Sequence, residues 1–470
     1  MVGTAFKKKL AVGLAALVLA TPGATSADTL ADALVGAYNT SGLLEQNRAL
    51  LRAADEDVAA AYSALRPVVD WTARINRTFG NSASANSGFR TVGSSNTSAT
   101  YELSIQLTLL DFGRTRLAID SAKESVLAAR EGLVTVEQNV LLRAVEGFMG
   151  VRSATETVAL RQNNVRLITQ ELRAANDRFE VGEVTRTDVA LAEAQLAGAR
   201  SALASAQGTL AQAQEEYAAV VGRRPATLVP PRAIPEIPAS LEQAKALAVR
   251  NHPDMKQAQR EVTVAELNIQ RAKAEFNPTV TLNGSYGVTE NFQSEAQTYG
   301  GSVGVTATSR LYQGGRRSAL LRQAQARRDA ARSNLHVVQV GLQQAAGNAW
   351  AFLQSTRAAR DASARQIRAA TVAFNGVREE AKLGARTTLD VLNAEQDLLD
   401  ARATLITATT DEYVAAYTLL YAAGLLTAEH LNLGVQQYDP SAYYNLVKDA
   451  PHVSQQGKSL DRVLKALGKN

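Results

Sequence analysis

Two hydrophobic patterns alternate along this chain, and the longer one repeats every seven residues. It covers two segments of equal length, Phe112 to Arg178 and Gly314 to Glu380. Each segment provides about 67 residues, or roughly 100 Å of α-helix at 1.5 Å per residue. This spacing is typical of a coiled-coil seam and predicts helices far longer than a compact globular domain needs. The seam positions are Val126, Leu133, Val140, Val151, Val158, Val165, Leu172 and Phe179, then Leu196, Leu203, Leu210 and Tyr217, then Val391, Leu398 and Leu405.

The shorter pattern alternates apolar with polar residues and predicts β-strands. It occurs four times, at about 67–80, 98–110, 278–290 and 298–311. In the first stretch Val69, Trp71 and Ile75 alternate with polar residues, and only Arg77 breaks the alternation. The lengths suit tilted strands that cross a lipid bilayer, with aromatic residues near the strand ends. A soluble sheet with one buried face is the alternative that the alternation leaves open.

Polar stretches at 81–97 and 291–297 are expected to be the loops between paired strands. Four strands are too few to close a barrel, since about eight is the smallest number that leaves a filled interior. We therefore expect a barrel that is shared between subunits. Two chains would supply eight strands, and three chains would supply twelve.

Both patterns occur twice because the chain is an internal duplication. The segment 181–189 recurs 202 residues later as 383–391. Upstream the offset between the two copies is 211, so that Pro67 aligns with Pro278. Each of these prolines marks a change from helix to strand. The sequence thus divides into a first repeat at 28–222, a Pro-rich linker at 223–239, a second repeat at 240–424, and a C-terminal segment with a flexible tail at 425–470.

Composition places the chain among exported proteins and excludes several functions. Residues 1–27 are predicted to be a cleaved signal peptide, because Lys7, Lys8 and Lys9 precede a short apolar run; an uncleaved anchor is the alternative. Without these three lysines, 47 basic side chains balance 45 acidic ones, which gives no support to nucleic-acid binding. Cysteine is absent, so neither a disulfide nor an N-terminal lipid is expected.

No pattern of catalytic residues is present, and we expect neither an enzyme nor a cofactor or metal. The four histidines, His252, His336, His430 and His452, are scattered and match no metalloprotease, P-loop or nucleophile-elbow motif. Each is expected to be an ordinary surface or core residue.

Several features together resemble the TolC family of outer-membrane efflux proteins. They are the duplication, the Pro-initiated strand pairs, the Leu-Asp-Phe-Gly-Arg segment at 110–114 with its counterpart at 311–316, and the Gly turns followed by Asp-Val. The resemblance implies a mostly α fold with a β-barrel part: long hairpins in an α-helical barrel, and four transmembrane strands per chain in a shared twelve-stranded barrel. It also implies a homotrimer in outer-membrane lipid that extends into the periplasm, a periplasmic adaptor, and an inner-membrane ABC transporter or other pump.

The expected function is that of a passive exit duct, and the sequence leaves two cargo classes open. The segment 434–447 resembles members that serve type I protein secretion. Members without an N-terminal lipid also serve small molecules, so a component of a drug or metal efflux pump is the alternative. A structural coiled-coil surface protein is a third hypothesis. The duplication favours the duct over it, because such a protein would not need a matched pair of long helical hairpins.

The repeated Gly turns, at about 179–187 and 381–389, are expected at the ends of the two hairpins. Gly182 and Gly384 suit the left-handed residue that often ends a helix. The resemblance implies that these tips dock the adaptor, with Glu183, Val184 and Ala385 as contact residues. Simple hairpin turns are the alternative.

One face of the second returning helix carries the candidate pore constriction. Asp390, Asn393 and Asp397 are three and then four residues apart and so share a helix face. Threefold symmetry would turn each into a ring; a carboxylate ring selects cations, and crowding of like charges should raise its apparent pKa. An ordinary solvated face is the alternative. Asn393 departs from the acidic residue that the resemblance implies.

The resemblance also implies a latch that holds the tips closed. Thr187, Asp188 and Arg386 match positions that carry such contacts, and the Arg386 guanidinium can donate to several oxygens. Ala381 stands where some relatives have a Tyr. We therefore expect weaker closure than in relatives with the full set.

Overall fold

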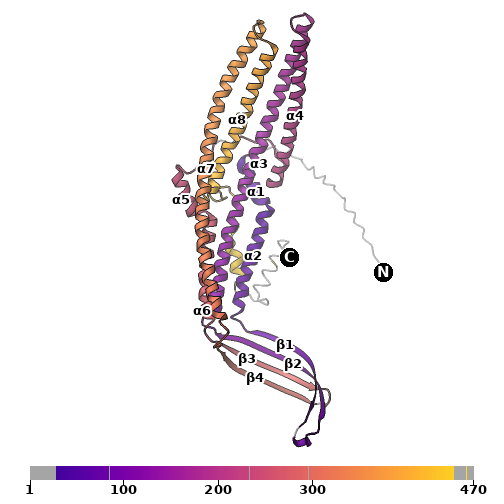
Figure 1. The fold of residues 1–470 in the computed structure, drawn as a ribbon, viewed down its shortest axis with the longest axis vertical. Coiled ribbons are helices and arrows are strands. Elements are labelled where there is room, and N and C mark those ends of the chain that lie inside the picture. Colours follow the sequence, from indigo (N-terminus) through magenta and orange to yellow (C-terminus); the bar gives the residue numbers. More distant parts are fainter. Residues whose placement is uncertain (1–27, 84, 232, 295, 449–461, 463–470) are drawn as a thin grey trace, which may run out of the picture.

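The molecule is long and thin, with a sheet at one end and two helical tips at the other (Figure 1). The computed structural model describes residues 28–448, except residues 84, 232 and 295, together with residue 462. The expected signal peptide and most of the expected flexible tail lie outside the described residues. Within the described chain, no helix is both long enough and apolar enough to cross a membrane.

The elements follow one another in the same order in both halves of the chain. The first half runs through α1 (Leu30–Thr40), α2 (Gly42–Ser63), β1 (Val68–Ser82), β2 (Val92–Leu110), α3 (Arg114–Glu180) and α4 (Arg186–Val221), with a short 3-10 turn, Ala85–Ser87, between the strands. The second half runs through α5 (Leu241–Asn251), α6 (Pro253–Ala274), β3 (Thr279–Asn291), β4 (Gln297–Thr308), α7 (Arg316–Lys382) and α8 (Thr388–Ala422), and α9 (Pro440–Val447) follows. The predicted fold class is confirmed: mostly helical, with two long hairpins and four strands.

The four strands form one antiparallel sheet in the order β1-β2-β3-β4. The register places Trp71 opposite Leu103 and Leu103 opposite Tyr286, so the apolar residues of three strands share one face. The other face is rich in hydroxyl groups, and Ser285 and Ser302 lie within hydrogen-bond distance across β3 and β4 at 3.2 Å. Pairing of β2 with β3 joins the two repeats into one sheet and leaves β1 and β4 as its edges.

The expected polar loop at 81–97 is partly strand, because residues 81–82 belong to β1 and residues 92–97 to β2, so its predicted bounds were wrong. Pairing of β1 with β2 continues through Phe79 opposite Ser95 and on to Ser82 opposite Val92. β2 has 19 residues against 12 in β4, so the extra residues of the first copy lengthen the strands as well as the loop. Apolar alternation ends early there because a backbone ladder can continue in a polar ribbon without a buried face.

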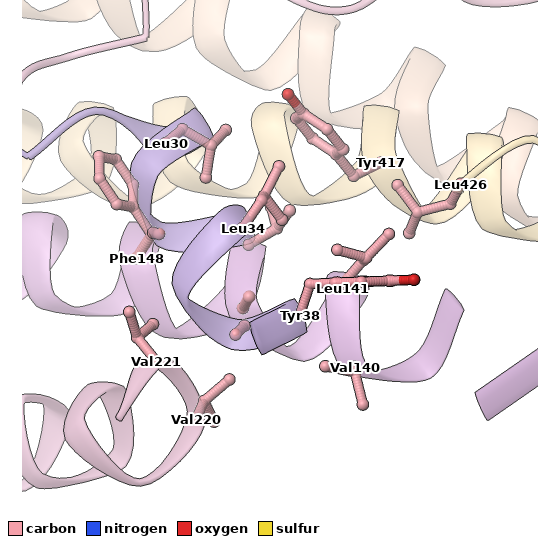
Figure 2. Close-up of a cluster of buried hydrophobic side chains, with 14 of the residues drawn as sticks. Leu30, Leu34, Tyr38, Val140, Leu141, Phe148, Val220, Val221, Tyr417 and Leu426 are labelled. Atoms are coloured by element: carbon pink, nitrogen blue, oxygen red, sulfur yellow. The ribbon is translucent and has the colours of Figure 1, made fainter. Parts of the chain in front are cut away.

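The largest buried cluster lies midway along the rods, where the short helix α1 packs against the first hairpin (Figure 2). Leu34 and Tyr38 of α1 pack with Phe148 of α3, Val221 of α4 and Leu420 of α8. A second cluster repeats this arrangement, with Ala248 of α5 against Leu353 of α7 and Leu419 of α8. Long hairpins are thin, so each repeat uses its first short helix to cover apolar surface that the hairpin alone leaves in water.

The linker and the C-terminal segment fasten across these helices. Asp28 lies beside the linker, where its N–H donates to the Thr227 oxygen at 3.0 Å and its carboxylate meets the Arg223 guanidinium at 2.8 Å. At the other end, Tyr443 in α9 donates to Glu56 in α2 at 2.7 Å. The Arg48 guanidinium lies 5.3 Å from the Tyr438 ring centroid. The described part of the expected C-terminal segment is therefore bound to the first repeat.

Gly424 ends α8 in a conformation that excludes other residues for two reasons. Its φ is +71°, and an added Cβ would lie 2.5 Å from the His252 Cα. Gly222 ends α4 in the same way, with Thr40 at 2.6 Å from the equivalent position. Each hairpin therefore ends in close contact with the short helix pair of its own repeat, through the Thr40 side chain in the first repeat and the His252 backbone in the second.

We expect Gly424→Ala to destabilise the protein more than Gly384→Ala. Gly384 also has a positive φ, at +78°, but an added Cβ there meets nothing within 4 Å. The Gly384 change should cost about 1 kcal/mol for the left-handed backbone alone, and the Gly424 change about 3 kcal/mol because the overlap with His252 is added. Denaturant unfolding of both variants checks this, and equal losses would contradict the close-packing argument.

Candidate functional site

Both hairpin tips are built from the same local hydrogen bonds. Gly182 and Gly384 adopt φ of +77° and +78°, and both are exposed. At the end of α3 the Gly182 N–H donates to the Phe179 oxygen at 3.0 Å and the Glu183 N–H to the Arg178 oxygen at 2.8 Å. Gly384 and Ala385 repeat these bonds to Ala381 and Glu380 at the end of α7. This is the Schellman arrangement, which pairs carbonyls that the last helical turn would otherwise leave without donors.

The returning helices each begin with a capping box, and two candidate site residues form part of it. The Thr185 N–H donates to Asp188 Oδ2 at 2.9 Å, and the Asp188 N–H donates back to the Thr185 hydroxyl at 3.3 Å. Thr387 and Asp390 repeat the pair at 3.0 and 3.2 Å. Asp188 and Asp390 thus hold the start of their own helices.

These caps lower the pKa of both carboxyl groups. The Thr185 hydroxyl and N–H that donate to Asp188 hold its pKa below the usual value, and the Thr387 N–H and hydroxyl do the same for Asp390. Crowding of three Asp390 carboxylates in a ring should raise their pKa. In each chain, however, the hydrogen bonds from Thr387 already hold the pKa of Asp390 below its usual value. Within the single chain the direction is opposite to the one expected for the ring.

A cleft of about 570 Å³ lies between the two tips, and latch candidates from both hairpins line it. Asp188 from the first hairpin and Arg386 from the second both line it, as do the docking candidates Glu183, Val184 and Gly384. Thr187 is exposed and is not among its lining residues. The structure thus places Asp188 and Arg386 on opposite walls of one open space.

Arg386 bonds within its own hairpin. Its Nε donates to Glu380 Oε2 at 2.8 Å, across the turn from the end of α7. This bond raises the already high pKa of the guanidinium. Ala381, where the sequence suggested a missing Tyr, lines the same cleft with only a methyl group.

The three pore candidates share a face of α8 but differ in their surroundings. Asn393 and Asp397 are exposed, whereas Asp390 is half-buried in its capping box. An exposed amide and carboxylate at this spacing suit either a lumen wall or an ordinary solvated surface, so the pore role stays a prediction.

The contact between the two hairpins contains a residue that the sequence reasoning missed. Glu395 in α8 is only 4% exposed and accepts a hydrogen bond from the Asn164 amide of α3 at 3.0 Å. Its second oxygen, Oε2, has no hydrogen-bond partner in the described structure. Burial raises the pKa of this carboxyl to about 7. The hairpins are thus joined by a polar pair in which the acid is readily protonated.

A signal for Glu395 was present in the sequence. It lies four residues after Val391 and three before Leu398, so it belongs to the apolar stripe of α8. A second, longer contact joins the hairpins nearer the tip, where Arg378 Nε lies 3.9 Å from Glu171 Oε1.

The described histidines form no metal site. His252 is buried and caps α6, where its Nδ1 accepts the Asp254 N–H at 3.2 Å, while His336 and His430 are exposed. His452 lies outside the described residues. Among the residues that the structure describes, no group of three or more potential ligands could hold a metal ion.

Comparison with known sequences matches both halves of the chain to one family. The family model described as outer membrane efflux protein matches residues 37–223 and 245–425. The chain is 37% identical over 441 residues to the outer membrane efflux protein BepC of Brucella suis, covering 93% of this chain and 94% of that protein. It is 28% identical over 353 residues to the alkaline protease secretion protein AprF of Pseudomonas aeruginosa, covering 70% of each.

Solved structures share the fold at lower sequence identity. The Campylobacter jejuni CmeC outer membrane channel superposes with a TM-score of 0.74 at 16% identity, covering 89% of both chains. A CusC structure superposes with a TM-score of 0.73 at 18% identity, covering 85% of this chain and 92% of the other.

We expect Glu395→Gln to make stability less dependent on pH. In the folded chain the pKa is about 7 against an ordinary 4.5, so folding favours the protonated acid, and its contribution to stability falls as pH rises from about 4.5 through 7. The amide keeps an acceptor for Asn164 and carries no charge. The variant should match wild type near pH 4 and exceed it by about 3 kcal/mol at pH 8.

Thermal unfolding across this pH range measures the difference. Asp400→Asn, which removes an exposed carboxylate from the same helix, serves as the control and should not change the pH profile. A Glu395→Gln profile parallel to that of wild type would show that the buried acid does not govern the pH dependence.

Proposed function

Because the chain belongs to the outer membrane efflux protein family, we propose that it is a passive exit duct that carries substrate across the periplasm and the outer membrane. The family is one of channel and transport proteins, and its members are located in the outer membrane, as predicted for this chain. This membership rules against a structural coiled-coil surface protein.

One observation carries the proposal: each half of the chain supplies a strand pair and a complete long hairpin, joined end to end. The two halves lie side by side, with both hairpin tips at the end opposite the sheet (Figure 1). Strands β1 and β4 are the edges of the sheet, and within the described residues the outer side of each has no partner strand. Three copies that joined edge to edge would form a twelve-stranded barrel with the rods continuing below it.

In this arrangement the tips are the docking surface of a periplasmic adaptor. Gly182, Glu183, Gly384 and Ala385 are exposed, and Val184 lines the cleft between the tips. The adaptor would couple the duct to an ABC transporter or another pump of the inner membrane. The duct itself then needs no energy source, cofactor or catalytic site.

Two cargo classes remain in view, and different observations favour each. Type I protein secretion is supported by the C-terminal segment and by the similarity to a protein named for alkaline protease secretion. Small-molecule efflux is supported by the greater similarity to a protein named as an efflux protein. Crosslinking through a cysteine placed at Glu183, followed by identification of the captured pump, would separate the two classes.

We expect purified protein to conduct ions in planar bilayers and Asp397→Asn to reduce its preference for cations. Asp397 is the exposed carboxylate of the pore candidates, so a ring of three should attract cations and repel anions. Reversal potentials in a salt gradient measure this preference. Glu236→Gln removes the same charge from the exposed linker and should change nothing. Conductance without any effect of Asp397→Asn would reject the constriction, and absence of conductance in tip-opened variants would reject the duct.

Arg386→Ala is expected to increase the current through the closed channel. The change removes the guanidinium that the second-hairpin turn presents to the cleft lined by Asp188, so a closing movement can no longer latch the two tips through it. Lys382→Ala is the matched control, because Lys382 lines the same cleft but pairs with Glu379 on its own helix at 2.7 Å. Single-channel recording compares the two, and an equal current in Arg386→Ala and wild type would reject the latch.

A further inference from the structure

The four long helices alternate between first and second members of the two hairpins. α3 packs against α4 on one side and α8 on the other, and α8 in turn packs against α7, which gives the order α4, α3, α8, α7 (Figure 1). In the contact between hairpins, the first helix of one repeat thus meets the second helix of the other. At the two ends of this row, α4 is a second helix and α7 is a first helix, so their outer flanks are of the same two types as the helices that meet between the hairpins. Within the described residues, neither flank is covered by another long helix.

The polar pair in the α3–α8 contact has a counterpart on these two flanks. α3 and α7 have the same length and are offset by 202 residues, as are the starts of α4 and α8. Asn164 therefore corresponds to Gln366 on α7, and Glu395 corresponds to Glu193 on α4. An amide donor and a carboxylate acceptor are present at both sets of positions.

The two sets differ in exposure. Asn164 and Glu395 are each 4% exposed, whereas Gln366 and Glu193 are both exposed. The same holds for their neighbours. Leu160, Leu167 and Leu399 line the contact between the hairpins and are buried or half-buried, while their counterparts are the exposed alanines Ala362, Ala369 and Ala197.

We propose that a second copy of the chain covers these flanks, with Gln366 of one copy facing Glu193 of the partner subunit. The proposal rests on the assembly of several chains in the proposed duct and fixes the register of α7 against the partner's α4. A large apolar side chain on the same face of α7 supports a protein partner, since Phe352, fourteen residues before Gln366, is 46% exposed in the single chain.

Charge complementarity favours this pairing. The residue beside Asn164 is Asn163, whereas the residue beside Gln366 is Arg365, which is exposed. Arg365 would thus bring a guanidinium to the partner's Glu193. The contact between copies would be wetter and more charged than the contact within a copy, because alanines replace leucines around the carboxylate and an arginine replaces an asparagine.

The absence of cysteine from the sequence allows a direct test by crosslinking in full-length protein. The variant Glu193→Cys/Gln366→Cys, treated with a short bis-maleimide, should run as a covalent multimer on denaturing gels. Asn164→Cys/Glu395→Cys is the positive control, because its crosslink lies within one chain and should leave the monomer mass. Glu193→Cys/Ala359→Cys shifts the register by seven residues, about 10 Å of helix, and should give at least about fivefold less multimer.

Charge exchange gives a second, independent measurement. Glu193→Arg and Arg365→Glu should each lower the resistance of the multimer to detergent, and the double variant should restore much of it. Multimer formation by the out-of-register pair in place of Glu193→Cys/Gln366→Cys would overturn the proposed register. If the Asn164→Cys/Glu395→Cys control crosslinks within one chain but neither of the other two cysteine pairs gives a multimer, the proposed interface itself is wrong. Conductance tests the duct separately, so an intact current with either of these failures would reject only this inference.

Discussion

The architecture depends on the burial of α8 on two opposite faces. Tyr417 and Leu420 belong to the core cluster of the first repeat, while Ala415 and Leu419, on other faces of the same turns, belong to that of the second. A single hairpin is too thin to enclose a core, so the helix that both repeats share carries the contact between them. Its polar residues follow the same division.

Two buried acids of α8 show how this shared helix is held. Glu412 accepts from Arg360 at 2.6 Å and lies 3.4 Å from Arg357, so its charge is paired with guanidinium groups of its own hairpin. Glu395 faces the other hairpin, has only a neutral amide as partner, and keeps one oxygen without a donor. At these two positions α8 is therefore held within its own hairpin by paired charges and against the other hairpin by a hydrogen bond from an uncharged amide. A duct that opens by movement of one hairpin past the other would move at this contact.

The tips combine structural and functional demands on the same side chains. Asp188 and Asp390 cap their own helices, so any role in a gate or a constriction would be shared with the start of a helix. Arg386 bridges its own turn through Glu380, and only a rearrangement would free it to meet Asp188 across the cleft. The turns therefore hold the latch candidates apart within one chain, and a closed latch requires a partner copy or a closing movement.

Local patterns alone determined most of the fold. The seven-residue spacing predicted both long helices at their observed length. Gly182 and Gly384 marked the two tips, and Pro67 and Pro278 preceded the two strand pairs. These signals could be read from the sequence because each acts over a few residues of backbone. The far end of the β1–β2 ribbon escaped prediction, since its ladder depends on pairing and not on a buried face. The duplication itself was visible in the sequence, and it implied two equivalent halves. Only the tertiary structure decided how the halves differ: Glu193 and Glu395 occupy the same position of the repeat, yet α3 covers one and leaves the other in water, because burial is set by the neighbouring helix and not by the residue.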